Sequence, residues 1–198
     1  MVEKQTYVIT ISRQLGSGGA YLGQKIAETL GIRYLDRDIL LRSAEEMEDQ
    51  ESFWMSFIAN CSYNWPYVPP SYNLLAEDRL HEKFVTMMQK VAREHSCVIV
   101  GRCAGFILSR HPKVLNIFLY ADAEWRTKRV QELYTLSEKK AQKAVNNNDS
   151  ERANYHYLHT GEKWRDATQY DLCIDTSAIG LNKAEKIVIE YIKEWLKE

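Results

Sequence analysis

A run of glycines after a short β-branched segment carries the strongest chemical signal in the sequence. The run reads ISRQLGSGG and occupies residues 11–19. Glycines let the backbone turn so that successive N–H groups point toward one anion, and the N-terminus of a following helix adds its positive end. We therefore predict an anion-binding loop formed by Gly16, Ser17, Gly18 and Gly19. The alternative is a glycine-rich turn that holds no ligand.

The loop departs from the usual phosphate-loop pattern, G-x-x-x-x-G-K-[ST], in which a lysine contacts the β- and γ-phosphates and a hydroxyl contacts magnesium. Arg13 stands at the first glycine of that pattern, Gly19 at the lysine and Ala20 at the hydroxyl. Loss of one such charge lowers a rate by roughly 10²–10³-fold. Arg13 is near enough in sequence to supply a replacement charge.

Arginines recur where the predicted strands end. Their planar guanidinium groups suit bidentate contacts with phosphate, and phosphoryl transfer needs little beyond positioning and charge neutralisation. Together they predict a polyphosphate site, whereas each taken alone is compatible with a solvated surface charge. The basic residues concerned are Arg37, Arg42, Arg102, Arg126, Lys128, Arg129, Arg152 and Arg165.

Short, continuously apolar runs alternate with helical stretches along the chain. Strands of that kind, separated by helices, are typical of a parallel sheet covered on both faces. The predicted fold class is therefore α/β, with a five-stranded parallel sheet flanked by helices. The predicted strands are residues 7–11, 33–35, 97–100, 114–120 and 172–175. The predicted helices are residues 20–30, 37–48, 74–95, 123–134 and 182–196.

Local signals predict several helix ends. Gly31 is a suitable residue just past the end of the first helix, and Asp122 is a suitable N-cap for the helix that follows it. Asn182 and Glu185 have capping-box spacing at the start of the last helix. Three consecutive asparagines, residues 146–148, predict a break in the chain.

Two segments interrupt the alternation within what we predict to be a single domain, residues 1–198. They are a helical and aromatic insert, residues 50–95, and a polar lid region, residues 135–170. The aromatic part of the insert, residues 53–72, predicts either a cover over the site or a homodimer contact. The predicted core comprises residues 1–49, 96–134 and 171–198.

Composition limits the classes of partner. The chain has 198 residues and a formal net charge of −1, which argues against a polymeric nucleic acid as ligand. No apolar run approaches the roughly 20 residues that span a bilayer, so we expect no membrane partner. The four cysteines show no paired spacing and the N-terminus lacks a signal-peptide core, from which we expect free thiols and a cytoplasmic location.

Six stretches resemble, in order, the cytidylate kinase-like branch of the nucleoside monophosphate kinases. They are ITISR…GSGG, LDRDIL, VIVGRCA, AEWRTKR, DSER and IDTS, which lie within residues 9–19, 35–40, 98–104, 123–129, 149–152 and 174–177. Together they extend over nearly the whole chain and leave only residues 50–95 without a clear counterpart. The Gly-Gly pair at residues 18–19 is itself fairly specific to this branch.

The resemblance implies a phosphate-loop kinase that transfers the γ-phosphate of ATP to a nucleoside monophosphate, CMP-like, with Mg²⁺ and with no protein metal ligand. It implies that residues 16–19 hold the ATP phosphates. The expected monophosphate-binding residues are Asp36, Arg42 and Arg102, and the expected lid residues are Arg126 and Asp149. The expected catalytic residues are Arg129 and Arg152, together with Arg13 from the loop.

Two departures from that family pattern leave alternatives open. Gly19 replaces the loop lysine, which is compatible with a non-catalytic nucleotide-binding or regulatory protein. Cys103 stands where an acidic residue follows the Gly-Arg pair, which weakens the case for cytidine as the base. The unusual aromatic segment, residues 53–72, favours a kinase of another small metabolite. Cys103 itself is either a buried small residue or a thiol activated by the charge of Arg102.

Overall fold

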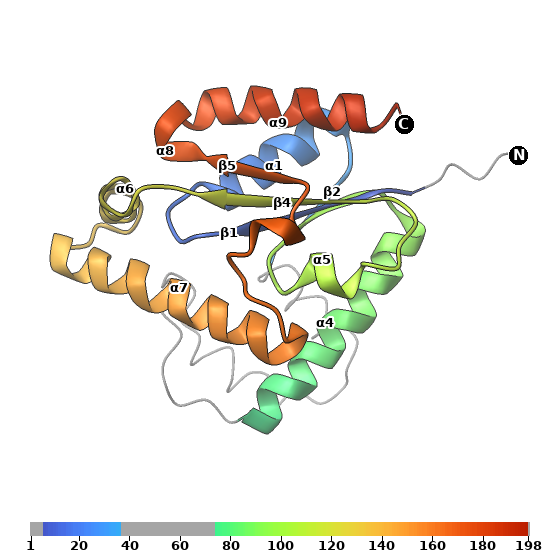
Figure 1. The fold of residues 1–198 in the computed structure, drawn as a ribbon, viewed down its shortest axis with the longest axis horizontal. Coiled ribbons are helices and arrows are strands. Elements are labelled where there is room, and N and C mark those ends of the chain that lie inside the picture. Colours follow the sequence, from blue (N-terminus) through green and yellow to red (C-terminus); the bar gives the residue numbers. More distant parts are fainter. Residues whose placement is uncertain (1–5, 37–73, 198) are drawn as a thin grey trace, which may run out of the picture.

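The computed structural model describes residues 6–36 and 74–197, which form a five-stranded, fully parallel sheet (Figure 1). The order of the strands across the sheet is β2-β3-β1-β4-β5, so β1 lies in the middle. This confirms the predicted α/β fold class. The strands are β1 Val8–Arg13, β2 Arg33–Leu35, β3 Cys97–Val100, β4 Val114–Tyr120 and β5 Leu172–Asp175.

The central strand β1 extends two residues beyond its predicted end at Ile11. Its pairing with β3 ends at Ile11 and Val100, but its pairing with the longer β4 continues to Arg13 and Leu119. The prediction stopped too early because apolar character ends at Ile11, whereas the backbone pairing does not. Arg13 is therefore held on the sheet rather than in the glycine-rich loop.

Helices α1 (Gly19–Leu30) and α9 (Leu181–Trp195) cover one face of the sheet (Figure 1). Their inward residues include Leu22 and Ile26 of α1 with Val188 and Ile192 of α9, all buried against the apolar side chains of the strands. Each such side chain contributes about 1.5–3 kcal/mol relative to an exposed one. The apolar cluster on this face is larger than the cluster on the opposite face of the sheet.

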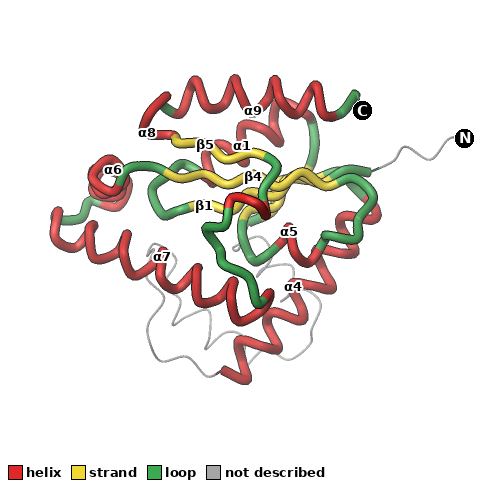
Figure 2. Tube along the Cα trace, in the orientation of Figure 1, coloured by secondary structure: helices red, strands yellow, loops and turns green. Residues whose placement is uncertain are grey.

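The opposite face is covered by α4 (Leu74–Glu94), the short helix α5 (Ala104–Ile107) and α7 (Glu138–Thr160) (Figure 1). Phe84 and Met88 of α4 are fully buried there. The predicted helix 74–95 is confirmed to within one residue. Figure 2 shows α7 running from the end of α6 (Ala123–Tyr134) to the lower part of α4.

Most predicted helix ends are confirmed, and two predictions are wrong. Gly31 ends α1 with a left-handed φ of 64°, and the Asp122 side chain accepts hydrogen bonds from the first backbone N–H groups of α6. The predicted capping box of the last helix does not form: α9 begins at Leu181 after Gly180, and Glu185 instead accepts a hydrogen bond from the Tyr21 hydroxyl. Helix-to-helix contact has displaced the local cap.

The predicted break at residues 146–148 is also wrong, because α7 is continuous over 23 residues. Asparagine has low helix propensity, but Asn148 and the following Asp149 are buried against the rest of the domain. Tertiary contacts therefore hold the helix together where propensity is low.

The segment after α7 is anchored to the sheet. Trp164 is buried and packs edge-on against Phe118 of β4 at 5.5 Å between ring centroids, and Tyr170 lies 4.9 Å from the same ring. The chain then passes through η1 (Ala167–Gln169), β5 and α8 (Thr176–Ile179). The C-terminal part of the predicted lid region is thus packed on β4.

Some predictions fall on residues that the structure leaves out. The helix predicted at 37–48, Arg42 and the aromatic segment 53–72 with its homodimer contact all lie outside the described residues. Among the helices within 6–36 and 74–197, none is both long and apolar enough to cross a bilayer.

Candidate active site

Two turns of the chain meet at the carboxyl ends of the central strands. We call residues 14–19, after β1, the β1 corner, and residues 101–103, after β3, the β3 corner. From the β1 corner the chain enters α1 on one face of the sheet, and from the β3 corner it enters α5 on the other (Figure 1). Ligands of open parallel sheets bind at the carboxyl ends of neighbouring strands whose following segments pass to opposite faces of the sheet.

The β1 corner has the backbone of an anion-binding loop. Gly16 and Gly18 have left-handed φ angles of 84° and 91°, which other residues rarely adopt. A side chain at Gly18 would collide with Leu181, and one at Gly16 would lie 2.9 Å from the Arg126 carbonyl oxygen. The N-cap residue of α1 is Gly18, which has no side chain to accept a hydrogen bond from the first N–H groups of the helix, and such groups can bind an anion.

Ser17 supports this loop from inside. Its hydroxyl is fully buried and lies 2.9 Å from the Gln14 carbonyl oxygen and 3.1 Å from that of Leu119. The Ser17 carbonyl in turn accepts a hydrogen bond from the Thr176 hydroxyl at 2.9 Å. The side chain therefore faces the sheet, and the Ser17 backbone is also hydrogen-bonded inside the protein, with its N–H 3.3 Å from the Gln14 carbonyl oxygen.

A buried ion pair holds the loop from behind. One Asp149 carboxylate oxygen accepts a hydrogen bond from Leu15 N–H at 2.9 Å, and the other lies 2.8 Å from Arg126 Nη1. Arg126 also donates to the carbonyl oxygens of Leu15 and Ala121. Arg126 and Asp149 were expected in the lid; the structure places both against the loop backbone, where they fix its shape.

Three guanidinium groups gather beside the two corners. Arg152 of α7 donates a 2.6 Å hydrogen bond from Nη1 to the Arg13 carbonyl oxygen. Burial lowers the pKa of Arg152 well below its usual range, the charges of Arg13 and Arg102 lower it further, and Asp149 opposes them. Among the described residues, the positive charges of Arg13 and Arg102 therefore disfavour the charged form of Arg152, and an anion bound beside them would favour it.

The β3 corner presents the side chain of Arg102 in an unusual backbone conformation. Arg102 and Cys103 have φ angles of 56° and 57°, and non-glycine residues in the left-handed region are concentrated at functional sites. The Arg102 guanidinium carbon lies 5.3 Å from the Phe84 ring centroid and 5.0 Å from that of Tyr155. Cation–π contact with rings from α4 and α7 thus fixes this guanidinium.

Cys103 belongs to a row of three hydrogen-bonding side chains that the sequence did not reveal; Cys103 and His156 are buried and Gln169 is half-buried. Cys103 Sγ lies 3.8 Å from His156 Nδ1, and His156 Nε2 lies 3.1 Å from Gln169 Oε1. Because the Gln169 amide nitrogen donates to the Lys163 carbonyl, its oxygen faces His156, so we assign the proton to Nε2. Nδ1 then accepts from the Cys103 thiol.

The surroundings of Cys103 and His156 favour the neutral form of both side chains. Burial raises the pKa of Cys103 to about 12, despite the opposing charge of Arg102, and burial lowers the pKa of His156. Of the two interpretations of Cys103, the structure agrees with the buried residue rather than the activated thiol. Only the absence of an acidic residue after Gly101-Arg102 gave a hint of this arrangement in the sequence.

The remaining predicted site residues lie farther along the same edge. Asp36 directly follows β2, the neighbour of β3. Arg129 lies one turn after Arg126 on α6; its guanidinium carbon is 5.8 Å from the Trp125 ring centroid, and its buried Nε has no hydrogen-bond partner in the part of the chain that the structure describes. The structure thus brings Arg13, Arg102 and Arg152 together and leaves Arg129 in separate contacts.

A parallel sheet with this strand order, a glycine-rich turn after its first strand and clustered arginines defines the phosphate-loop kinase class of fold. The chain belongs to the cytidylate kinase-like family, whose model matches residues 8–178. No curated protein matches the chain significantly.

Solved structures agree with this class. An uncharacterised protein from Eubacterium ventriosum ATCC 27560 is 27% identical with a TM-score of 0.76, and the match covers 95% of this chain and 99% of that one. Shikimate kinase from Bacteroides thetaiotaomicron is 15% identical with a TM-score of 0.56 over 97% and 99% of the two chains. Shikimate kinase from Acinetobacter baumannii, in complex with shikimate, is 12% identical with a TM-score of 0.54 over 97% and 95%. The last two share the kinase fold.

Proposed function

We propose that this protein is a phosphotransferase that moves the γ-phosphate of ATP to a small acceptor bearing its own phosphate, a nucleoside monophosphate of the CMP type. The observation that carries the proposal is the gathering of Arg13, Arg102 and Arg152 beside the anion-binding turn at residues 16–19. Family membership supports the use of ATP. The cationic groups at one edge supply the charge neutralisation that phosphoryl transfer requires.

The proposed reaction needs little proton chemistry. An anionic oxygen of the acceptor phosphate attacks the γ-phosphorus, the bond from that phosphorus to the β–γ bridging oxygen breaks, and ADP leaves with the bond electrons. Because a phosphate oxygen is already anionic at neutral pH, no protein base has to remove a proton. The chain contributes the backbone N–H groups of the β1 corner and the three guanidinium charges.

The residues that the structure describes do not by themselves form a magnesium site. Within residues 6–36 and 74–197 no group of three His, Cys, Asp or Glu side chains could hold a metal ion. Ala20 supplies no hydroxyl and the Ser17 hydroxyl points inward. The Asp149 carboxylate is occupied by Arg126, Arg165 and the Leu15 N–H. Magnesium commonly enters such sites on substrate phosphates with several waters.

A second candidate function, nucleotide binding without turnover, is favoured by Gly19 and by the inward Ser17 hydroxyl. A third, phosphorylation of a different small acceptor, is favoured by the neutral Cys103–His156–Gln169 chain, which replaces an acidic residue at the β3 corner. All three functions share the loop and differ in the acceptor side of the site.

An ADP-release assay with ATP, magnesium and a panel of monophosphates separates the three functions. Turnover with CMP or UMP supports the proposal, turnover only with an unrelated acceptor supports the third function, and calorimetric ADP binding without turnover supports the second. Failure to bind either ATP or ADP would contradict all of them.

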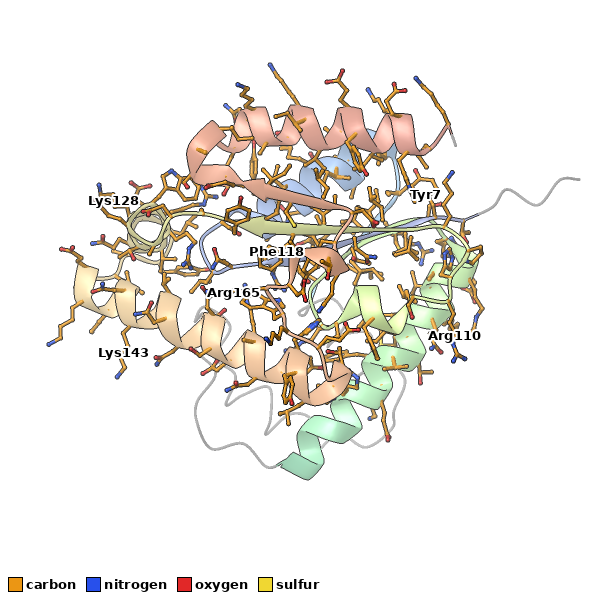
Figure 3. All side chains as sticks on the ribbon, viewed as in Figure 1. Tyr7, Arg110, Phe118, Lys128, Lys143 and Arg165 are labelled. Atoms are coloured by element: carbon orange, nitrogen blue, oxygen red, sulfur yellow. The ribbon has the colours of Figure 1, made fainter. Side chains whose placement is uncertain are left out.

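Variants of two arginines provide the matched comparison. Arg152→Ala should lower kcat by roughly 10²-fold or more, since it removes a charge beside the loop. Arg110→Ala should leave kcat unchanged, because Arg110 is exposed just beyond α5, at the edge of the molecule away from Arg165 and α6 (Figure 3).

A further inference from the structure

The side chain of Arg13 crosses the first residue of α1. A Cβ atom built on Gly19 would lie 2.5 Å from Arg13 Cγ, 2.8 Å from Cβ and 3.2 Å from Cδ. Since Cβ contacts under 3.0 Å are essentially never observed, no side chain fits at residue 19 while Arg13 keeps this course. The Arg13 side chain therefore occupies the space that a side chain at residue 19 would need.

The far end of Arg13 reaches the β3 corner. A Cβ atom on Gly101 would overlap Arg13 Nη1 and would lie 3.0 Å from Cζ. The guanidinium thus lies over Gly101, next to Arg102, while its stem lies over Gly19. One side chain links the loop that would hold the phosphate donor with the turn that would face the acceptor.

The backbone of Arg13 is fixed on two sides. It pairs with Leu119 of β4, and its carbonyl oxygen accepts the 2.6 Å hydrogen bond from Arg152. A side chain that starts from a strand held in this way projects along a defined path. The charge at its end is consequently placed between the two corners.

Two positions of the usual loop pattern are exchanged in this chain. The pattern has glycine at the position of Arg13 and lysine at the position of Gly19, whereas here the long cation is at 13 and the glycine at 19. We infer that Arg13 replaces the loop lysine as the cation that contacts the transferred phosphate, and that glycine at residue 19 leaves the space that the Arg13 side chain needs. This inference rests on the proposed kinase function.

The test is a reciprocal exchange of the two residues. Arg13→Gly should lower kcat by roughly 10²–10³-fold. Gly19→Lys alone should lower kcat by about 10²-fold, because the aliphatic part of the introduced lysine displaces the Arg13 side chain. Arg13→Gly combined with Gly19→Lys rebuilds the usual pattern and should recover kcat to within about tenfold of the unchanged protein. Independent effects would instead multiply to a loss of roughly 10⁴-fold or more.

Controls separate charge from folding. Gln24→Lys adds the same charge to an exposed position of α1 and should leave kcat and the melting temperature unchanged. Melting temperatures of the Arg13 variants within a few degrees of the parent exclude a merely structural loss. ADP binding by Arg13→Gly should persist while kcat falls, because the loop backbone is retained.

The outcomes distinguish this inference from the proposed function. If the unchanged protein neither binds ADP nor turns over any acceptor, both are overturned. If it turns over and the losses of the two single variants multiply, or if Gly19→Lys raises kcat with Arg13 in place, only the exchange of roles is overturned.

Discussion

The β1 corner and the β3 corner both turn the chain through left-handed backbone, but they use different residues to do so. The β1 corner relies on Gly16 and Gly18, while the β3 corner follows Gly101 with Arg102 and Cys103 in the same region of φ. Glycine adopts that conformation freely, whereas other residues lose about 1–2 kcal/mol each.

The difference follows from what each corner presents. Glycines at the β1 corner expose backbone N–H groups to an anion, and the Arg126–Asp149 pair fixes them from behind. At the β3 corner the left-handed residues aim side chains, with Arg102 held between two rings and Cys103 facing His156. At the β3 corner the backbone strain therefore accompanies the placement of two side chains.

Loss of the buried pair should have the largest effect and should act on the β1 corner alone. Asp149→Ala leaves Arg126 buried without its partner and Leu15 N–H without an acceptor, which should lower the free energy of unfolding by about 3–5 kcal/mol. Urea unfolding followed by circular dichroism measures this loss in the free energy of unfolding. The exposed pair on α6, Glu124 with Lys128 at 2.9 Å, has nearly the same length, so Glu124→Gln should leave the unfolding midpoint unchanged.

Gly18→Ala should have the next largest effect, because it combines backbone strain with a collision against Leu181. We expect a loss of about 2–4 kcal/mol in the free energy of unfolding and loss of ADP binding. Gly161 provides the matched glycine, since its φ is +74° and nothing lies near its missing Cβ. Gly161→Ala should cost only the strain, about 1 kcal/mol; equal losses for the two would contradict a built loop.

The β3 corner should show a pH dependence that comes from His156. Burial lowers the pKa of His156 below its ordinary 6.5 in the folded protein, so on acidification the unfolded chain takes up the proton first. The stability from neutral His156 is therefore present above pH 6.5 and is lost as the pH falls through the lowered value, by up to about 1.4 kcal/mol per pH unit.

His156→Gln should flatten that part of the stability curve, measured by urea unfolding at several pH values between 7 and the acid limit. His95→Gln, at a partly exposed position after α4, should leave the slope in place. An unaltered slope in the His156 variant would show that this residue is not the titrating group.

The smallest effect concerns thiol reactivity. The pKa of Cys103 is raised to about 12 by burial, and Cys173 is the exposed one among the described cysteines. Iodoacetamide at neutral pH should therefore label Cys173 in the folded protein and reach Cys103 only after denaturation, as read by peptide mass spectrometry. Rapid labelling of Cys103 in the native state would mean that the β3 corner opens.

Much of the fold could be predicted because its signals are local. Continuous apolar runs marked the strands, and Gly31 and Asp122 marked two helix ends that the structure confirms. The predictions that failed involve competition between local and distant contacts: Glu185 bonds to Tyr21 rather than to its own helix, and the asparagines at 146–148 remain helical because α7 is packed.

For the candidate site, the sequence by itself determined the glycine-rich turn and the residue types around it, because anion binding by backbone N–H groups requires glycine at particular spacings. It could not separate the arginines by role, because the residue type alone does not show which group each guanidinium will face. Only the tertiary structure decided that Arg126 faces Asp149, that Arg152 and Arg13 meet, and that Arg13 lies over Gly19. The first two contacts join residues far apart in the chain, and the third depends on the course of a side chain that the folded sheet fixes, so none of them is visible in the sequence.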